Sequence, residues 1–309
     1  MSALDVFPLA LGGNTFGWTS DEGDSRDVLD AFVAGGGNFI DTADGYSAWV
    51  PGNSGGESET IIGGWLAARK NRDRVVIGTK VSQHPEFRGL SAANIAAAAD
   101  ASLGRLGTDH IDLYYAHFDD ASTPLAETVG AFDSLVKAGK IRWVGVSNYS
   151  ADRIRSWFEI ARSEGYALPV ALQPHYNLVH RGAYEREIAP IAAAEELAVV
   201  PYYGLASGFL TGKYKTADDL AGSARGRGAG AYLNDGGLGV VKVLEDVAAA
   251  HGVTAATVAL AWLRGRPAVV APIASARTPE QLPALLASAT LELTADETAA
   301  LDEVSARVG

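Results

Sequence analysis

Cysteine is missing altogether from the 309 residues of this sequence, and methionine occurs only once. Disulfides, thiolate nucleophiles and cysteine-based metal sites are therefore excluded. Basic residues are also scarce, since 25 Lys and Arg face 37 Asp and Glu, for a formal net charge of -12 at pH 7. A nucleic-acid-binding protein usually carries a basic face that neutralises phosphates, so we expect no nucleic-acid partner.

Long apolar runs and a recognisable targeting segment are absent too. The chain starts MSALDVFPLALGGNTFGW, which lacks the basic region and apolar run of a signal peptide. No segment approaches the roughly 20 apolar residues that a membrane-spanning helix needs. Because 48% of the residues are hydrophobic, the chain can nevertheless bury a sizeable core. We therefore expect a cytoplasmic protein with no membrane association.

What is present is an alternation of short β-branched or aromatic runs with longer, Ala-rich segments of helical periodicity. Several of the short runs are apolar without alternation, as expected for strands buried on both faces of a parallel sheet. Eight runs are predicted as strands, near Leu9, Ile40, Val76, Leu113, Val144, Ala171, Val200 and Val270.

Helix signals fill the intervals between these runs. Ser25 is predicted to open the first helix, and the glycines at 35–37 to end it. Ser91 and Ser150 are predicted to open two later helices, and Pro124 marks the start of another. Alternating strands and helices imply parallel pairing with right-handed crossovers.

Eight strand–helix units that close on themselves form a (β/α)8 barrel, the TIM barrel of the α/β class. No linker rich in Pro, Gly or Ser divides the chain, so residues 1–309 are predicted to form a single barrel domain. A doubly wound sheet is less consistent with the sequence, because the first strand is followed by LGGNTFG and not by a Gly-x-Gly-x-x-Gly turn. In a barrel, the active site lies at the carboxyl-terminal mouth of the strands.

Ionisable residues stand at the ends of three consecutive predicted strands. Asp41 ends the second run, with Tyr46 just beyond it. Lys80 ends the third run and His117 the fourth. Taken singly, the three strand-end residues have ordinary explanations as a helix cap, a surface lysine and a core histidine, and Tyr46 as a loop tyrosine. Because such groups are costly at the ends of apolar strands unless they pair, the joint pattern predicts that all four converge on one site.

The motifs FIDTADGY, VVIGTKV, DLYYAH, GVSNY, LQPHYN and FLTGKY occur in this order, and nearly the whole chain resembles the aldo-keto reductases. The resemblance implies a catalytic tetrad of Asp41, Tyr46, Lys80 and His117. Tyr46 would be the general acid that protonates a carbonyl oxygen while hydride reaches the carbon. Lys80, held by Asp41, would place a positive charge beside the phenol and bring its pKa of about 10 closer to neutrality. His117 would orient the carbonyl.

The same resemblance implies NADPH as the cofactor. Ser147, Asn148 and Gln173 would bind the carboxamide, and Tyr202 would stack on the nicotinamide ring. The other implied contacts are Ser207, Leu210 and Lys213 beside the pyrophosphate, and Ser275, Arg277 and Gln281 around the adenosine phosphate. The chain departs from the family at Tyr203 and Gly204, where a small hydroxyl residue and proline are common, and at Leu285, where asparagine is frequent.

Trp18, Trp49 and Phe118 lie near the tetrad in the sequence and are predicted to line an apolar pocket over a small carbonyl substrate. The sequence does not decide whether that substrate has an aliphatic, aromatic or sugar-like body, nor the oligomeric state. Two other functions stay open. One is a Schiff-base aldolase on the same fold with Lys80 as nucleophile. The other is a sensor or regulatory subunit that binds NADPH to signal to a partner.

No metal site is predicted, because His117 has no second His or Cys at ligand spacing, and Asp119 and Asp120 form only a weak oxygen cluster. Turnover should therefore survive treatment with a chelator. The measurement is steady-state activity before and after dialysis against EDTA. Loss of activity that a divalent cation restores would contradict a metal-free mechanism.

Overall fold

The computed structural model of the chain describes residues 5–308. Its main sheet has eight strands, each parallel to its neighbours, in the order β10-β1-β2-β3-β6-β7-β8-β9. The two ends of the sheet meet, because Val199 N donates to Ala268 O at 2.8 Å and Val270 N donates to Val199 O at 2.9 Å. The sheet therefore closes into the predicted (β/α)8 barrel. Its strands are β1 Ala10–Gly12, β2 Phe39–Asp41, β3 Val76–Val81, β6 Ile111–Ala116, β7 Ile141–Ser147, β8 Pro169–Gln173, β9 Ala198–Val199 and β10 Ile273–Ala274.

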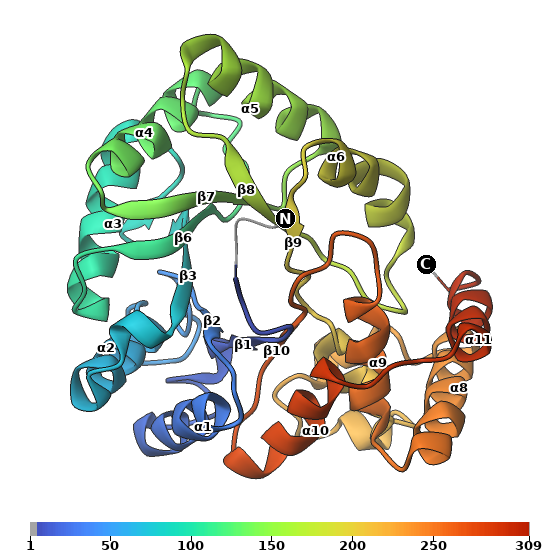
Figure 1. Cartoon of the computed structure of the whole chain (residues 1–309). Coiled ribbons are helices and arrows are strands. Elements are labelled where there is room, and N and C mark those ends of the chain that lie inside the picture. Colours follow the sequence, from blue (N-terminus) through green and yellow to red (C-terminus); the bar gives the residue numbers. More distant parts are fainter. Residues whose placement is uncertain (1–4, 309) are drawn as a thin grey trace.

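Helices surround the strands in a ring that follows the chain order from α1 to α6 and continues through the helices of the carboxyl-terminal third (Figure 1). The first six are α1 Glu22–Ala34, α2 Glu57–Arg69, α3 Ala92–Leu106, α4 Leu125–Lys137, which follows Pro124, α5 Ala151–Glu164 and α6 Ala189–Ala194. The others are α7 Gly226–Gly230, α8 Asp235–His251, α9 Ala255–Arg264, α10 Leu282–Leu286 and α11 Ala295–Ser305.

Three predicted helix starts are confirmed and one is wrong, and Pro124 directly precedes α4 as predicted. Ser91 and Ser150 each accept a backbone hydrogen bond as the N-cap of α3 and α5. The first helix starts before Ser25, because the side chain of Asp21 accepts a hydrogen bond from the first turn and so caps α1. Ser25 lies inside that turn, where its hydroxyl donates to Asp21 O.

Side chains of the strands alternate between the barrel interior and the layer of helices. In β6, Leu113 and Tyr115 lie inside the barrel in a cluster with Phe39, whereas Tyr114 belongs to the core between strands and helices. The Tyr115 ring fits because its neighbour is Gly145, where a Cβ would lie only 2.4 Å from Tyr115 Cδ1. The barrel interior is thus a packed core that supports the residues at its mouth.

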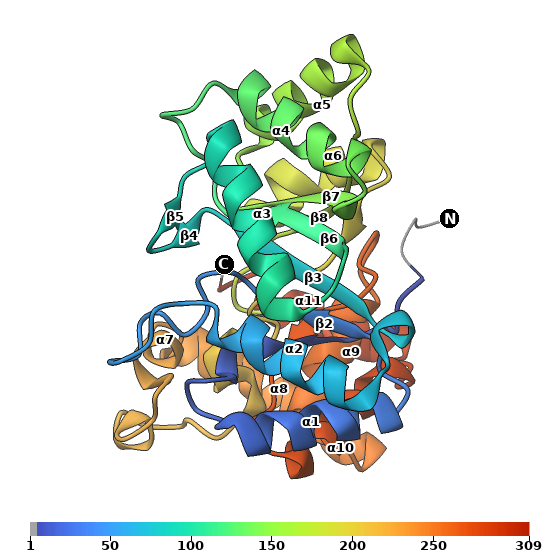
Figure 2. The same cartoon turned by 90° about the vertical axis from the view of Figure 1, so that its left-hand side faces the viewer.

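All carboxyl ends of the strands point to one end of the barrel, since every pairing in the main sheet is parallel. A small hairpin of β4 Gln83–His84 and β5 Phe87–Arg88, which the sequence analysis did not predict, projects on the same side of the molecule as α7 (Figure 2). Within residues 5–308, no single helix has the length and apolar composition of a membrane span. Only α8 and α9 taken together do, and they are bent by 97° at their junction.

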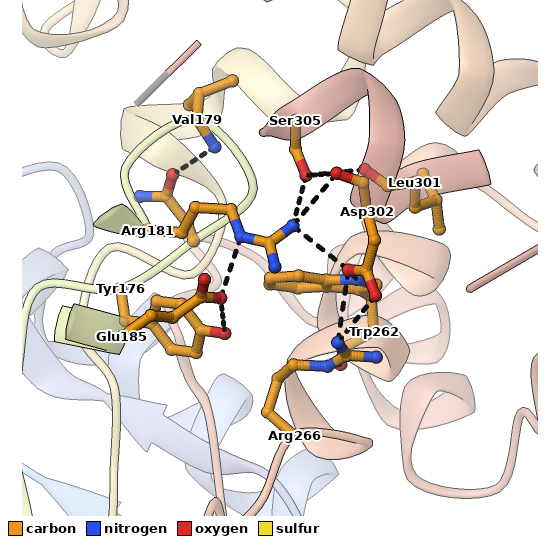
Figure 3. A network of polar contacts seen from close by, with 10 residues as sticks. Tyr176, Val179, Arg181, Glu185, Trp262, Arg266, Leu301, Asp302 and Ser305 are labelled. Atoms are coloured by element: carbon orange, nitrogen blue, oxygen red, sulfur yellow. Dashed lines mark hydrogen bonds and ion pairs between the residues drawn. The ribbon is translucent and has the colours of Figure 1, made fainter. Parts of the chain in front are cut away.

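The carboxylate of Asp302 links the carboxyl-terminal helix α11 to the barrel (Figure 3). Asp302 accepts hydrogen bonds from Trp262 Nε1 at 2.9 Å, Arg266 at 3.1 Å and Arg181 at 3.1 Å. The two guanidinium groups lie 4.6 and 5.1 Å from the centre of the Trp262 ring. This network joins α11 to α9 and to the segment that follows β8.

Asp302→Ala should lower the free energy of unfolding by about 1–3 kcal/mol, because three donors lose their shared acceptor. The measurement is urea unfolding followed by circular dichroism. Asp246→Ala is the matched control, since its ion pair with Lys242 is exposed on α8 and should contribute less than about 0.5 kcal/mol. Equal losses in the two variants would show that the Asp302 network does not anchor α11.

Candidate functional site

The residues predicted at the strand ends meet at the carboxyl-terminal mouth of the barrel. Asp41 is the last residue of β2, Lys80 lies near the end of β3, and His117 directly follows β6. Tyr46 lies in the turn after β2. Backbone hydrogen bonds fix this turn to the neighbouring strand, since Thr42 N donates to Gly78 O and Asp44 N donates to Lys80 O.

Lys80 is fully buried, and its ammonium nitrogen has three acceptors. Nζ donates to Asp41 Oδ2 at 2.7 Å, to Thr42 O at 2.6 Å and to the Tyr46 hydroxyl at 3.1 Å. Burial lowers the pKa of Lys80, while the charge of Asp41 opposes that shift. Three acceptors match the three N–H groups of an ammonium, so the surroundings favour the charged form.

The hydroxyl of Tyr46 accepts a hydrogen bond from Lys80 and therefore keeps its own proton as a donor. Tyr46 also lines the large cavity at the mouth, so that proton can reach a bound molecule. Burial, followed by the charge of Asp41, raises the pKa of Tyr46 well above its usual value. This differs from the lowered pKa expected from the sequence, because burial and the Asp41 carboxylate outweigh the lowering effect of the Arg225 cation. The phenol is consequently a donor that stays protonated at neutral pH.

His117 lies beside Tyr46, with 6.3 Å between the ring centres, and lines the same cavity. Burial and the charge of Lys80 lower its pKa well below the usual value, so the imidazole is neutral. Its Nδ1 is buried without a hydrogen-bond partner among the described residues. A neutral imidazole carries one N–H donor, which suits it to hold an oxygen atom in the cavity.

A hydrogen-bonded chain continues from Asp41 across the barrel to the next strands. Gln173 Nε2 donates to Asp41 Oδ1 at 2.8 Å, and the Ser147 hydroxyl donates to Gln173 O at 2.8 Å. Asn148 Nδ2 donates to Ser147 Oγ at 2.9 Å, and the Tyr202 hydroxyl donates to Asn148 Oδ1 at 2.6 Å. The residues assigned to catalysis and to the nicotinamide side thus form one connected network.

Two histidines that the sequence analysis did not single out form a stack beside the ring of Tyr202. The ring of His175 is stacked on Tyr202 with 5.3 Å between centres, and on His180 with 3.8 Å between centres. Burial and the neighbouring His180 lower the pKa of His175 to about 4, so this column of rings is uncharged at neutral pH. The sequence LQPHYNLVH gives no indication that these histidines stack, because such stacking depends on the geometry of the loop.

The mouth opens into a cavity of about 1050 Å³ that extends from Tyr46 and His117 to Gln281 and Leu285. Most predicted site residues line it, namely Trp18, Asp41, Tyr46, Trp49, His117, Phe118, Asn148, Gln173, Tyr202, Ser207, Lys213, Ser275, Arg277 and Gln281. Lys80 and Ser147 do not line the cavity, but each is hydrogen-bonded to a residue that does, Lys80 to Tyr46 and Ser147 to Asn148. Leu210 does not line the cavity, because its side chain is fully buried in the core.

Three cations line the far part of this cavity, and the sequence analysis named only two of them. Lys213 and Arg277 were predicted, whereas Arg225 lies in a segment of the chain without a recognisable pattern. Within residues 5–308, none of the three forms an ion pair with a carboxylate, although the chain as a whole is acidic. Burial lowers the pKa of Arg225, an effect that Tyr203 opposes and Arg277 strengthens. This part of the cavity is therefore suited to an anionic ligand.

Asn14, which the sequence analysis did not name, connects the segments around these cations. Its Oδ1 accepts from Ser275 Oγ at 2.7 Å and from Arg225 at 3.2 Å. The side-chain oxygen of Gln281 already has a partner in its own segment, since Oε1 accepts a hydrogen bond from Arg277 N at 2.8 Å.

The described residues contain no group of three His, Asp or Glu side chains placed to hold a metal ion.

Comparison with known proteins agrees with this geometry. Norsolorinic acid reductase stcV of Emericella nidulans is 35% identical over 96% of this chain and 78% of its own length. Protein tas of Escherichia coli is 32% identical over 98% of this chain and 95% of its own, and aryl-alcohol dehydrogenase GME11368 of Pestalotiopsis microspora is 32% identical over 96% and 78%. The sequence profile of the Aldo/keto reductase family matches residues 8–306. The chain therefore belongs to the Aldo/keto reductase family.

Proposed function

We propose that this protein reduces the carbonyl group of an aldehyde or ketone with NADPH, with Tyr46 as the proton donor. The observation that carries the proposal is the environment of Lys80. Its buried ammonium joins Asp41 and Tyr46 and donates to the Tyr46 hydroxyl, which lines the cavity and keeps its own proton as a donor. Membership of a family of oxidoreductases agrees with this reaction.

The residues of the cavity fit a nicotinamide dinucleotide. A volume of about 1050 Å³ is at the upper end of ligand sites and exceeds the needs of a small carbonyl compound alone. Amide side chains of Asn148 and Gln173 and the ring of Tyr202 lie at the catalytic end, where they would hold the nicotinamide. Arg225 and Arg277 lie in the part assigned to the phosphates, where they would pair with anionic groups. When bound, NADPH supplies the hydride.

Each residue around the carbonyl has a separate part in the proposal. Tyr46 donates its proton to the carbonyl oxygen as negative charge develops there. Lys80 donates a hydrogen bond to Tyr46 Oη and so stabilises the phenolate that remains. His117 is neutral and offers its N–H to the same oxygen, which orients the substrate. Asp41 keeps the Lys80 ammonium in place.

The geometry favours this reaction over a Schiff-base aldolase. A lysine nucleophile needs a free amine that faces the carbonyl carbon. Lys80 is fully buried, does not line the cavity and has each of its three donors engaged. A cofactor-sensing subunit is the remaining alternative, and it would bind NADPH tightly yet oxidise it with no member of a panel of aldehydes and ketones.

Tyr46→Phe should lower kcat by about 10²–10⁴-fold, because it removes the proton donor with little change in volume. NADPH affinity should change by less than about threefold, since the hydroxyl acts on the substrate. The measurements are steady-state NADPH oxidation and fluorescence titration. Tyr166→Phe, in the loop before β8, is the matched control and should keep full activity.

Lys80→Met should also lower kcat strongly. The double variant Tyr46→Phe/Lys80→Met should be little slower than either single variant, since the two side chains act as a unit. Retention of most of the activity by Tyr46→Phe would refute this assignment of the proton donor.

Cofactor choice generates a separate prediction. Arg277→Ala should weaken NADPH binding by about ten- to a hundredfold and leave NADH little changed, because a guanidinium contact with the 2′-phosphate contributes roughly 1.5–3 kcal/mol. Arg225→Ala should weaken both cofactors equally if Arg225 pairs with the pyrophosphate that they share. Both are measured as Kd by fluorescence titration.

Arg227→Ala is the control for charge alone, because Arg227 is exposed close by and does not line the cavity. Equal losses of NADPH and NADH affinity in Arg277→Ala would show that Arg277 does not read the 2′-phosphate.

A further inference from the structure

Asp44 carries a buried carboxyl group that the proposed reaction does not use. It lies in the turn after β2, between Asp41 and Tyr46, and its exposed fraction is 0%. Asp41 accepts hydrogen bonds from Lys80 and Gln173, whereas neither side-chain oxygen of Asp44 has a hydrogen-bond partner in the described part of the chain. A buried carboxylate without partners is costly, so this environment favours the neutral carboxylic acid.

The cations that face Asp44, Lys80 and Arg105, are already paired with other carboxylates. Lys80 donates to Asp41, and Arg105 Nε donates to Glu59 Oε2 at 2.7 Å. Glu59 is itself fully buried on the adjacent helix α2, and its charge acts on Asp44. An ionised Asp44 would therefore add a third negative charge to a region in which two cations already balance two carboxylates.

Two further titratable groups face this turn, and both are neutral. Tyr114 of β6 is buried, and burial raises its pKa well above the usual value. His84 of β4 lies beside Gly45, and burial lowers the pKa of its imidazole. The amides of Gly45 and Ser82 approach the Asp44 carboxyl without the geometry of a hydrogen bond, so they oppose its protonation only in part.

These surroundings keep Asp44 protonated near neutral pH. Burial, followed by the charge of Glu59, raises the pKa of Asp44 to about 8. The backbone amide of Asp44 donates to Lys80 O at 3.1 Å, which fixes the carboxyl next to the strand that carries this lysine. When Asp44 is ionised, its charge acts on Lys80 and raises the pKa of that ammonium.

We propose that Asp44 is a positioning residue that works as a neutral carboxylic acid, and that its ionisation at alkaline pH lowers turnover. Proton transfer from Tyr46 leaves a phenolate, and a further negative charge nearby makes that phenolate less stable. The same charge attracts the Lys80 ammonium away from the Tyr46 hydroxyl. The inference rests on the proposed reductase function and adds to it a residue outside the tetrad.

The first test is the pH profile of kcat for NADPH oxidation by the full-length protein, with the fastest-reacting aldehyde of a panel. Asp44→Asn keeps the shape of the side chain but cannot ionise. The ratio of kcat at pH 9 to kcat at pH 7 should be about three- to tenfold lower in the wild-type protein than in Asp44→Asn. Asp73→Asn is the matched control, since Asp73 is exposed before β3 at the opposite end of the barrel, and it should keep the wild-type ratio.

Glu59→Gln is a second variant for the same profile. It removes a neighbouring negative charge and releases Arg105 from its ion pair, and both changes favour an ionised Asp44. The fall in kcat should therefore begin at a lower pH in Glu59→Gln than in the wild-type protein.

Urea unfolding tests the protonation of Asp44 without any measurement of activity. The pKa of an aspartate in an unfolded chain is about 3.9. The folded protein therefore binds one proton more than the unfolded chain between this value and the pKa of about 8 in the folded state, and Asp44 lowers stability progressively as the pH rises through that window. The urea midpoint of the wild-type protein should fall between pH 5 and pH 8.5 relative to that of Asp44→Asn.

The possible failures are distinguishable. Equal kcat ratios in the wild-type protein and Asp44→Asn, or an unshifted profile in Glu59→Gln, would overturn the role of Asp44 in turnover and leave the reductase function standing. Urea midpoints that change in parallel with pH would overturn the buried neutral acid. Absence of NADPH oxidation with every aldehyde and ketone would refute the proposed function and with it the effect on turnover, whereas the urea comparison would still decide the protonation of Asp44.

Discussion

The buried ion pair between Lys80 and Asp41 is the interaction on which the arrangement of the mouth depends. Removing two charges from water costs several kcal/mol for each, and this cost is offset only if both are well paired. Here Nζ has three acceptors, while the second carboxylate oxygen of Asp41 accepts from Gln173 across the barrel. Satisfying one buried charge therefore fixes side chains from β2, β3 and β8 at once.

Hydrogen bonds connect this ion pair to side chains further around the mouth of the barrel. Gln173 is linked through Ser147 and Asn148 to Tyr202, so the groups expected around the nicotinamide share their support with the proton donor. Strands built into a closed barrel provide a rigid base for these contacts. Loops supply the variable part, and some of them are tied together by side-chain hydrogen bonds, such as those from Asn53 to Gly17 O and Ser47 O.

The meeting of the strand-end residues was predicted from the sequence, whereas one loop residue was misplaced and another was missed. The eight strands, their parallel closure and the meeting of Asp41, Lys80 and His117 follow from a regular repeat, because every strand in such a barrel ends at the same mouth. Leu210 was assigned to the cavity by position along a motif, but the kinked 3-10 segment Ala206–Thr211 turns its side chain into the core. Arg225 was missed, because nothing in a stretch of Gly, Ala and Arg shows which side chain turns inward.

Composition, periodicity and motif order sufficed to define an α/β barrel and an acidic, cysteine-free reductase-like chain. They define these properties because backbone periodicity and strand-end chemistry are local and repeat along the chain. The hydrogen bond from Lys80 to the Tyr46 hydroxyl, the raised pKa of that phenol and the edge-to-face contact of Trp18 and Trp49 were decided only by tertiary structure. Each of these depends on burial and on distances of a few ångströms between segments far apart in sequence, and burial can reverse the effect of a neighbouring charge.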